Sequence, residues 1–182
     1  MLFGNVSTFA IECEVTDRVD QRWTFGHFRM WVAGHSVGDY SDSADLRGCL
    51  NWLIDSVSGA DDRREPSLDD CSKEEVFRLI YETFVLTIPK GVHLLEYEPP
   101  EESDEMVAAR LTYPDARNRF HLDHVGMSSF DQWSVILVAR GDGAQRFIWK
   151  KSRDYKIFET ILSEHCFEEV ASKFIEWARV NL

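Results

Sequence analysis

The chain has 182 residues, 44% of them hydrophobic and 13% aromatic, which is enough to bury one substantial core without disulfides or metals. Its 32 acidic residues exceed the 20 Lys and Arg and give a formal net charge of −12, which argues against binding to nucleic-acid phosphates or to an anionic membrane. The acidic charge favours a basic partner, and it also serves solubility.

The N-terminal third has the pattern of an antiparallel meander. Residues 9–15 alternate between apolar and polar side chains, and this period of two predicts a half-buried strand. After a polar turn at Asp17–Gln21, a second strand is predicted from Trp23, and its apolar phase slips beside Gly26, as in a β-bulge. A tight turn at Gly34 then leads into a third, short strand.

Two helices are predicted next. The first has apolar residues at helical spacing over Leu46–Val57, with Ser43 as its N-cap and Gly59 at its end. A charged link that contains proline follows it. Ser72 and Glu75 then have the spacing of a capping box, which predicts the start of a second amphipathic helix.

The segment Pro89–Glu105 is dense in acidic residues and contains two adjacent prolines, so we interpret it as a loop or a variable acidic insertion. A solvated loop is the simpler interpretation. The functional interpretation is that the segment attracts a basic partner, and its candidate contact residues are Glu98, Glu101, Glu102, Asp104 and Glu105.

The last third returns to strands and closes on a helix. Strands are predicted over Met106–Tyr113, Arg119–Val125, Trp133–Ala139, Phe147–Trp149 and Tyr155–Leu162. Trp133–Ala139 is apolar on both faces, as a central strand is, and Gly141 and Gly143 predict a hairpin after it. The closing helix carries its apolar stripe over Phe167–Ala178.

This order of elements predicts an α+β fold in one domain over residues 1–182. We expect an antiparallel β-sheet, built from the N-terminal meander and the C-terminal hairpins, with two central helices and the C-terminal helix packed on it. Four cysteines without a CxxC pair indicate reduced thiols, and the longest apolar run is far shorter than the roughly 20 residues that span a bilayer. We therefore expect a cytoplasmic protein.

His121, Asp123 and His124 form the densest group of possible metal ligands. On a strand, His121 and Asp123 share a face while His124 points to the other, and no HExxH pattern supports a site. A polar strand or loop is the favoured interpretation, and a small metal-dependent enzyme that uses these three residues is the alternative.

Other catalytic patterns are missing from the sequence. It contains no GxSxG elbow and no glycine-rich phosphate loop. Cys166 follows His165 at the predicted start of the last helix, but adjacent helical residues do not face each other. We expect no enzyme activity, no metal and no cofactor.

Trp31 and Trp52 are candidate contact residues. Trp31 lies on the strand face opposite Met30 and Val32, and Trp52 lies off the apolar stripe of its helix. Burial in the core is the default for tryptophan, whereas an exposed tryptophan often anchors an interface. These two side chains are therefore predicted to contact a partner.

Both ends of the chain carry a distinctive set of short motifs: Met1-Leu2-Phe3-Gly4-Asn5, Phe9-Ala10-Ile11-Glu12, Gly26, Gly34, Gly38-Asp39, Phe130-Asp131-Gln132-Trp133, Phe167-Glu168-Glu169-Val170 and Phe174-Ile175-Glu176-Trp177. In these motifs the chain resembles a family of bacterial immunity proteins, the one numbered forty-two. The resemblance is weak from Asp61 to Phe120, which leaves open whether that region is an insertion.

Such proteins protect a bacterium from a polymorphic toxin made by itself or its siblings. The resemblance therefore implies a non-enzymatic inhibitor that binds a cognate toxin domain in the cytoplasm. The net charge suits a basic toxin such as a nuclease. An adaptor subunit of another complex has the same sequence features, and the oligomeric state is left open.

Overall fold

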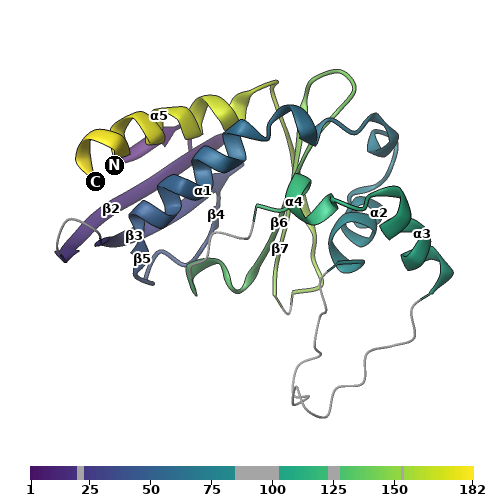
Figure 1. Cartoon of the computed structure of the whole chain (residues 1–182), viewed down its shortest axis with the longest axis horizontal. Coiled ribbons are helices and arrows are strands. Elements are labelled where there is room, and N and C mark those ends of the chain that lie inside the picture. Colours follow the sequence, from purple (N-terminus) through teal and green to yellow (C-terminus); the bar gives the residue numbers. More distant parts are fainter. Residues whose placement is uncertain (20–22, 85–102, 123–127, 153) are drawn as a thin grey trace, which may run out of the picture.

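The computed structural model describes residues 1–19, 23–84, 103–122, 128–152 and 154–182. Within these ranges the strands form two antiparallel sheets, one of five strands and one of three, and helices pack against both (Figure 1). The predicted α+β class is confirmed. The N-terminal meander and the C-terminal hairpins lie in separate sheets.

The five-stranded sheet is the predicted meander. Its strands are β1 (Leu2–Gly4), β2 (Phe9–Val19), β3 (Trp23–Val32), β4 (His35–Val37) and β5 (Ala44–Asp45). The central strand β3 pairs with β2, β4 and β5. Ala33 and Gly34 have φ of 49° and 81°, and two positive φ values in a row form the hairpin turn whose twist matches the strands.

The β-bulge lies on β2 and not, as predicted, on β3. The register shifts between Val15 and Asp17, so Thr16 is the extra residue, and Gly26 stays opposite Val15. A Cβ atom at Gly26 would lie 1.9 Å from the carbonyl oxygen of Glu14, so only glycine fits beside the bulge.

The change of phase in the apolar residues along β3 does not come from a bulge in that strand. Trp23 and Phe25 lie on the opposite face from Phe28 and Met30, and the buried and less buried residues alternate without interruption. The first residues of the predicted turn, Asp17 to Val19, belong instead to β2, because Val19 pairs with Trp23.

Helices α1 (Leu46–Ser58) and α5 (Cys166–Asn181) lie side by side on one face of the five-stranded sheet (Figure 1). The first core lies between them and the sheet and includes Phe9, Ile11, Cys13, Phe28, Met30, Val32, Leu46, Cys49, Leu53, Phe167, Val170, Ala171, Phe174, Ile175 and Ala178. Both helices were predicted. The N-cap of α1 is Asp45 and not Ser43, because β5 pairs with β3 and the helix starts only after it.

The three-stranded sheet consists of β6 (Trp133–Ala139), β7 (Gln145–Lys151) and β8 (Phe158–Leu162). Alternate side chains of this sheet belong to different cores: Val135, Leu137, Phe147 and Trp149 to the first, and Ile136, Val138 and Ile148 to the second. The two-faced apolar character predicted for Trp133–Ala139 is confirmed. The last strand begins at Phe158 and not at Tyr155, whose side chain is fully exposed.

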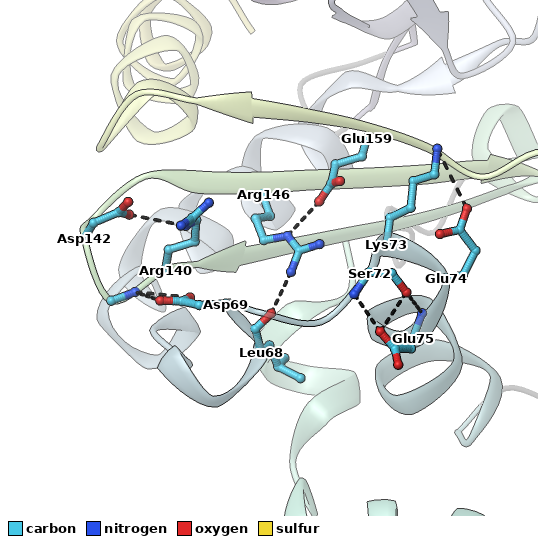
Figure 2. Close-up of polar contacts among 11 residues, drawn as sticks. Leu68, Asp69, Ser72, Lys73, Glu74, Glu75, Arg140, Asp142, Arg146 and Glu159 are labelled. Atoms are coloured by element: carbon cyan, nitrogen blue, oxygen red, sulfur yellow. Dashed lines mark hydrogen bonds and ion pairs between the residues drawn. The ribbon is translucent and has the colours of Figure 1, made fainter.

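The second core is covered by α2 (Lys73–Phe77), the π-helical turn Arg78–Glu82 and α4 (Ala116–Phe120), and α3 (Asp104–Thr112) packs against the π-helical turn. The predicted capping box at the start of α2 is confirmed, as Figure 2 shows: the Ser72 hydroxyl accepts from the Glu75 amide at 3.2 Å, and the Glu75 carboxylate accepts from the Ser72 amide at 2.7 Å.

Two of the predicted strands are wrong. Met106–Tyr113 lies largely in α3, because the Ser103 hydroxyl caps the Met106 amide at 3.2 Å and starts a helix there. Arg119–Val125 begins inside α4, and beyond it His121 forms only an isolated bridge with Ile136. Residues 123–127 lie outside the described residues.

The link between α1 and α2 folds into two 3₁₀ turns, Asp61–Arg63 and Pro66–Leu68, which polar contacts tie to the three-stranded sheet. The buried Arg146 donates from Nε to Glu159 and from Nη1 to the Leu68 carbonyl, both at 2.6 Å (Figure 2). The Gly141 amide donates to the Asp69 carboxylate at 3.0 Å. These contacts fix the link together with the side chain of Leu68, which is buried in the second core.

A second polar network is buried between α1, the Asp61–Arg63 turn, β7 and α5. The Arg63 guanidinium donates to the Glu168 carboxylate at 2.5 Å and to the Ser56 carbonyl at 2.5 Å. The Gln145 amide donates to the other Glu168 oxygen at 2.6 Å and accepts from the Phe167 backbone amide at 3.0 Å. Both charges of the ion pair are therefore surrounded by hydrogen-bond partners.

Candidate functional site

The five-stranded sheet has a second face, turned away from α1 and α5, which we call the outer face. In an antiparallel pair, directly opposed residues project to the same side. The register of β2 and β3 therefore assigns to the outer face the residues Glu12, Glu14, Asp17, Val19, Trp23, Phe25, His27, Arg29 and Trp31. No helix among the described residues is long and apolar enough to cross a membrane.

The centre of the outer face is a cluster of Glu12, Arg29, Trp31 and Tyr40. The Arg29 guanidinium lies 4.2 Å from the centroid of the Trp31 ring and 4.3 Å from that of Tyr40. The Glu12 carboxylate accepts from Arg29 Nε and from the Trp31 indole, both at 2.8 Å. The cluster thus combines an ion pair with two cation–π contacts, and these interactions fix the positions of its side chains.

Two pKa values reflect this arrangement. Burial raises the pKa of the Glu12 carboxyl, but the hydrogen bonds from Trp31 and Arg29 and the Arg29 charge outweigh burial and leave that pKa below its ordinary value. Burial, together with the nearby carboxylates, raises the pKa of the Tyr40 hydroxyl. At neutral pH the cluster therefore keeps an ionised carboxylate and a neutral phenol.

One end of the outer face is apolar. Trp23 and Val19 are opposed in the register, and each is 50% exposed. The Phe25 ring is nearly parallel to the Trp23 ring, with 6.2 Å between the two centroids. Large apolar side chains exposed together are typical of contact surfaces.

Most of the remaining charge on and beside the outer face is acidic, although Lys151 borders the same hollow as Arg29 and Asp39. Glu14 and Asp17 are exposed on β2, and Asp39 and Asp42 follow β4, close to Tyr40. Hydrogen bonds from the hydroxyl and the backbone amide of Ser41 hold the pKa of Asp39 below its ordinary value. These carboxylates give the outer face a negative field around its aromatic rings.

The two predicted tryptophans lie on different sides of the five-stranded sheet. Trp31 is on the outer face, opposite Met30 and Val32 as predicted. Trp52 projects from α1 on the other side, where it meets Phe28 edge to face, with 6.4 Å between the ring centroids. Trp52 also borders a hollow of about 860 Å³ between α1, the Asp61–Arg63 turn and α4.

Of the predicted acidic contact residues, the structure describes Asp104 and Glu105, and neither lies on the outer face. Asp104 and Glu105 form the first turn of α3, at the far end of the molecule from β2 and β3 (Figure 1). The Arg78 guanidinium pairs with Glu105 and holds the pKa of that carboxyl below its ordinary value. Glu98, Glu101 and Glu102 lie outside the described residues.

Of the three possible metal ligands, the structure describes His121 alone. Its ring is buried, stacks on Tyr81 at 4.8 Å between centroids, and has Nε2 2.8 Å from the Ile80 carbonyl oxygen. Asp123 and His124 lie outside the described residues. Among the residues in the described ranges, no group of three or more His, Cys, Asp or Glu side chains is arranged to hold a metal.

Cys166 begins α5, as predicted, and burial raises the pKa of its thiol. A raised pKa lowers the thiolate fraction at neutral pH, and the thiolate is the nucleophilic form. His165 is paired with Glu164 at 3.8 Å and not with the thiol. Cys166 is therefore a partly buried, weakly nucleophilic thiol at the start of α5.

Sequence patterns alone do not identify five residues of the outer face as contact candidates: Glu12, Trp23, Phe25, Arg29 and Tyr40. Glu12 and Arg29 are 17 residues apart and meet only because the β2–β3 register opposes them. Trp23 and Phe25 follow the default interpretation as core residues, because tryptophan and phenylalanine are usually buried. The period of two along β3 could have identified this face, because Trp23, Phe25, Arg29 and Trp31 alternate with the residues of the buried face.

Replacing Glu12 with glutamine is expected to lower the free energy of unfolding at pH 7 by about 1 kcal/mol, at the low end for a charged hydrogen bond because the pair is partly exposed. The folded-state pKa of Glu12 is depressed, so its stabilisation is fully present above the unfolded-state value of about 4.3 and is lost as the pH falls through the folded-state pKa. Urea denaturation at neutral and acidic pH measures this change.

The matched control is Glu14→Gln, an exposed carboxylate on the same strand face, which we expect to change stability by no more than about 0.5 kcal/mol. A difference between the wild type and Glu12→Gln that stayed constant from pH 7 to well below pH 4 would contradict the proposed ion-pair contribution.

A comparison with protein families matches residues 1–177 to the model described as immunity protein 42. The matched range includes Asp61–Phe120, where the residues alone give only a weak resemblance. No curated protein and no solved structure matches the chain.

Proposed function

The chain belongs to the immunity protein 42 family, and from this premise we propose that it binds a cognate bacterial toxin domain in the cytoplasm and neutralises it by protein–protein contact. The family match over residues 1–177 is the observation that carries the proposal. The preformed cluster of Arg29, Trp31 and Tyr40 supports it, because these residue types are enriched among the anchors of protein interfaces.

Speed and tightness of binding are both needed, because the toxin must be captured before it acts. The net charge of −12 would accelerate the approach of a basic toxin, for example a nuclease. Trp31 belongs to this proposal as a contact residue. Contacts by Trp52 and by the acidic residues Glu98, Glu101, Glu102, Asp104 and Glu105 stay predictions.

The test is to express the toxin domain encoded beside this chain, alone and together with it. We expect growth to be restored only in the presence of the chain, and the purified pair to bind with a Kd of about 1 nM or below, which corresponds to about −12 kcal/mol. Restored growth with a covalently unmodified toxin would support inhibition by binding. Cells that die equally fast with and without it would refute the proposal.

A further inference from the structure

We propose that the outer face is the surface that docks the toxin, and that it takes a segment of the toxin rich in lysine or arginine. This inference rests on the proposed function and adds the place of contact and the chemistry of the partner. Three features of the outer face support it: its row of solvent-side aromatic rings, its acidic field and its preformed centre.

The first feature is the aromatic character of β3 on the outer face. The solvent side of an antiparallel sheet is ordinarily polar, since alternation turns the apolar residues inward. Here β3 places Trp23, Phe25, His27 and Trp31 at alternate positions on the solvent side, and Trp23 is half exposed. Such side chains gain free energy when a partner covers them.

The second feature is the sign of the charge that is left for a partner. Arg29 is held between two rings and paired with Glu12 at 2.7 Å, so this pair contributes no net charge. Glu14 and Asp17 remain exposed on the outer face, where the register opposes Glu14 to His27 and Asp17 to Phe25. Cationic side chains are attracted both to carboxylates and to the faces of aromatic rings, whereas an anionic partner is repelled.

The third feature is the rigidity of the centre. Glu12 is held by donors from two residues of β3, and Tyr40 closes over Arg29 from the loop after β4. Side chains that are already ordered lose little conformational entropy on binding. The centre thus serves as a fixed anchor, while the carboxylates around it guide a basic segment into place.

The experiment measures the binding of the purified, catalytically inactive toxin domain encoded by the neighbouring gene to variants of this chain. The double variant Glu14→Lys/Asp17→Lys is expected to weaken binding roughly 10- to 100-fold, mostly through a slower association rate that depends less on salt. The milder Glu14→Gln/Asp17→Asn is expected to weaken it several-fold. Trp23→Ala is expected to speed dissociation.

The control is Glu74→Lys/Glu176→Lys, which changes the net charge equally. Both glutamates are exposed on helices away from the outer face. It should bind nearly as the wild type does, and circular dichroism should confirm that every variant is folded. If the wild type neither binds nor rescues, the proposed function fails. If it rescues, and Glu14→Lys/Asp17→Lys binds as tightly as the wild type or no worse than the control, the outer face is not the docking surface.

Discussion

Replacing Arg63 with methionine is expected to lower the free energy of unfolding by about 3–5 kcal/mol. Glu168 would then remain buried with Gln145 as its only described polar partner, and an uncompensated buried carboxylate is costly. The variant would also leave the Ser56 carbonyl without the hydrogen bond that Arg63 donates. Urea denaturation at pH 7, followed by circular dichroism, measures the loss.

The double variant Arg63→Met/Glu168→Leu tests the cause. It removes both charges, so most of the lost stability should return, because apolar residues of similar volume commonly replace a buried ion pair at little net cost. An Arg63→Met protein that unfolds at the wild-type urea concentration would show that the ion pair is not the source of stability.

Replacing Phe28 with alanine is expected to cost about 3–5 kcal/mol, as for large aromatic residues in protein cores. Phe28 is fully buried, and its ring lies between those of Trp52, Phe130 and Phe174, with centroids 6.4, 6.1 and 5.6 Å away. The variant would leave a cavity where the five-stranded sheet meets both helices. Thermal and urea unfolding of the purified variant measure the effect.

Phe25→Ala is the matched control, since Phe25 lies three residues earlier on the same strand but on the outer face. Its removal should cost less than half as much, because the site opens to water and leaves no closed cavity. Equal losses for the two variants would mean that β3 does not separate a core face from an outer face.

The sequence predicted those elements whose apolar residues follow one clear period. The strand β2 and the helices α1 and α5 are of this kind, while an apolar run on both faces and a glycine turn predict β6 and β7. The N-cap of α1 and the first half of the turn after β2 differ from the prediction. Prediction failed from Met106 to Leu122, the described part of the two wrongly predicted strands. Its helices are short, and α3 buries a single residue, Ala109, so no apolar period marks it.

The candidate site was less predictable, because it depends on which residues face each other across strands. A bulge at Thr16 decides that Asp17 and Val19 join the outer face, and one shifted residue would have turned both inward. The cluster of Glu12 and Arg29 depends on the same register. Trp31 could be predicted because its neighbours on β3 establish which face it occupies.

The division of β6 and β7 between two cores constrains how the length of this chain can vary. Ile136, Val138 and Ile148 are buried only because the helices between residues 61 and 120 cover them. Shortening that region would uncover a contiguous apolar surface, which promotes self-association. A shorter chain would keep the half built on the five-stranded sheet intact only if these three positions, which follow the region in the sequence, became polar at the same time.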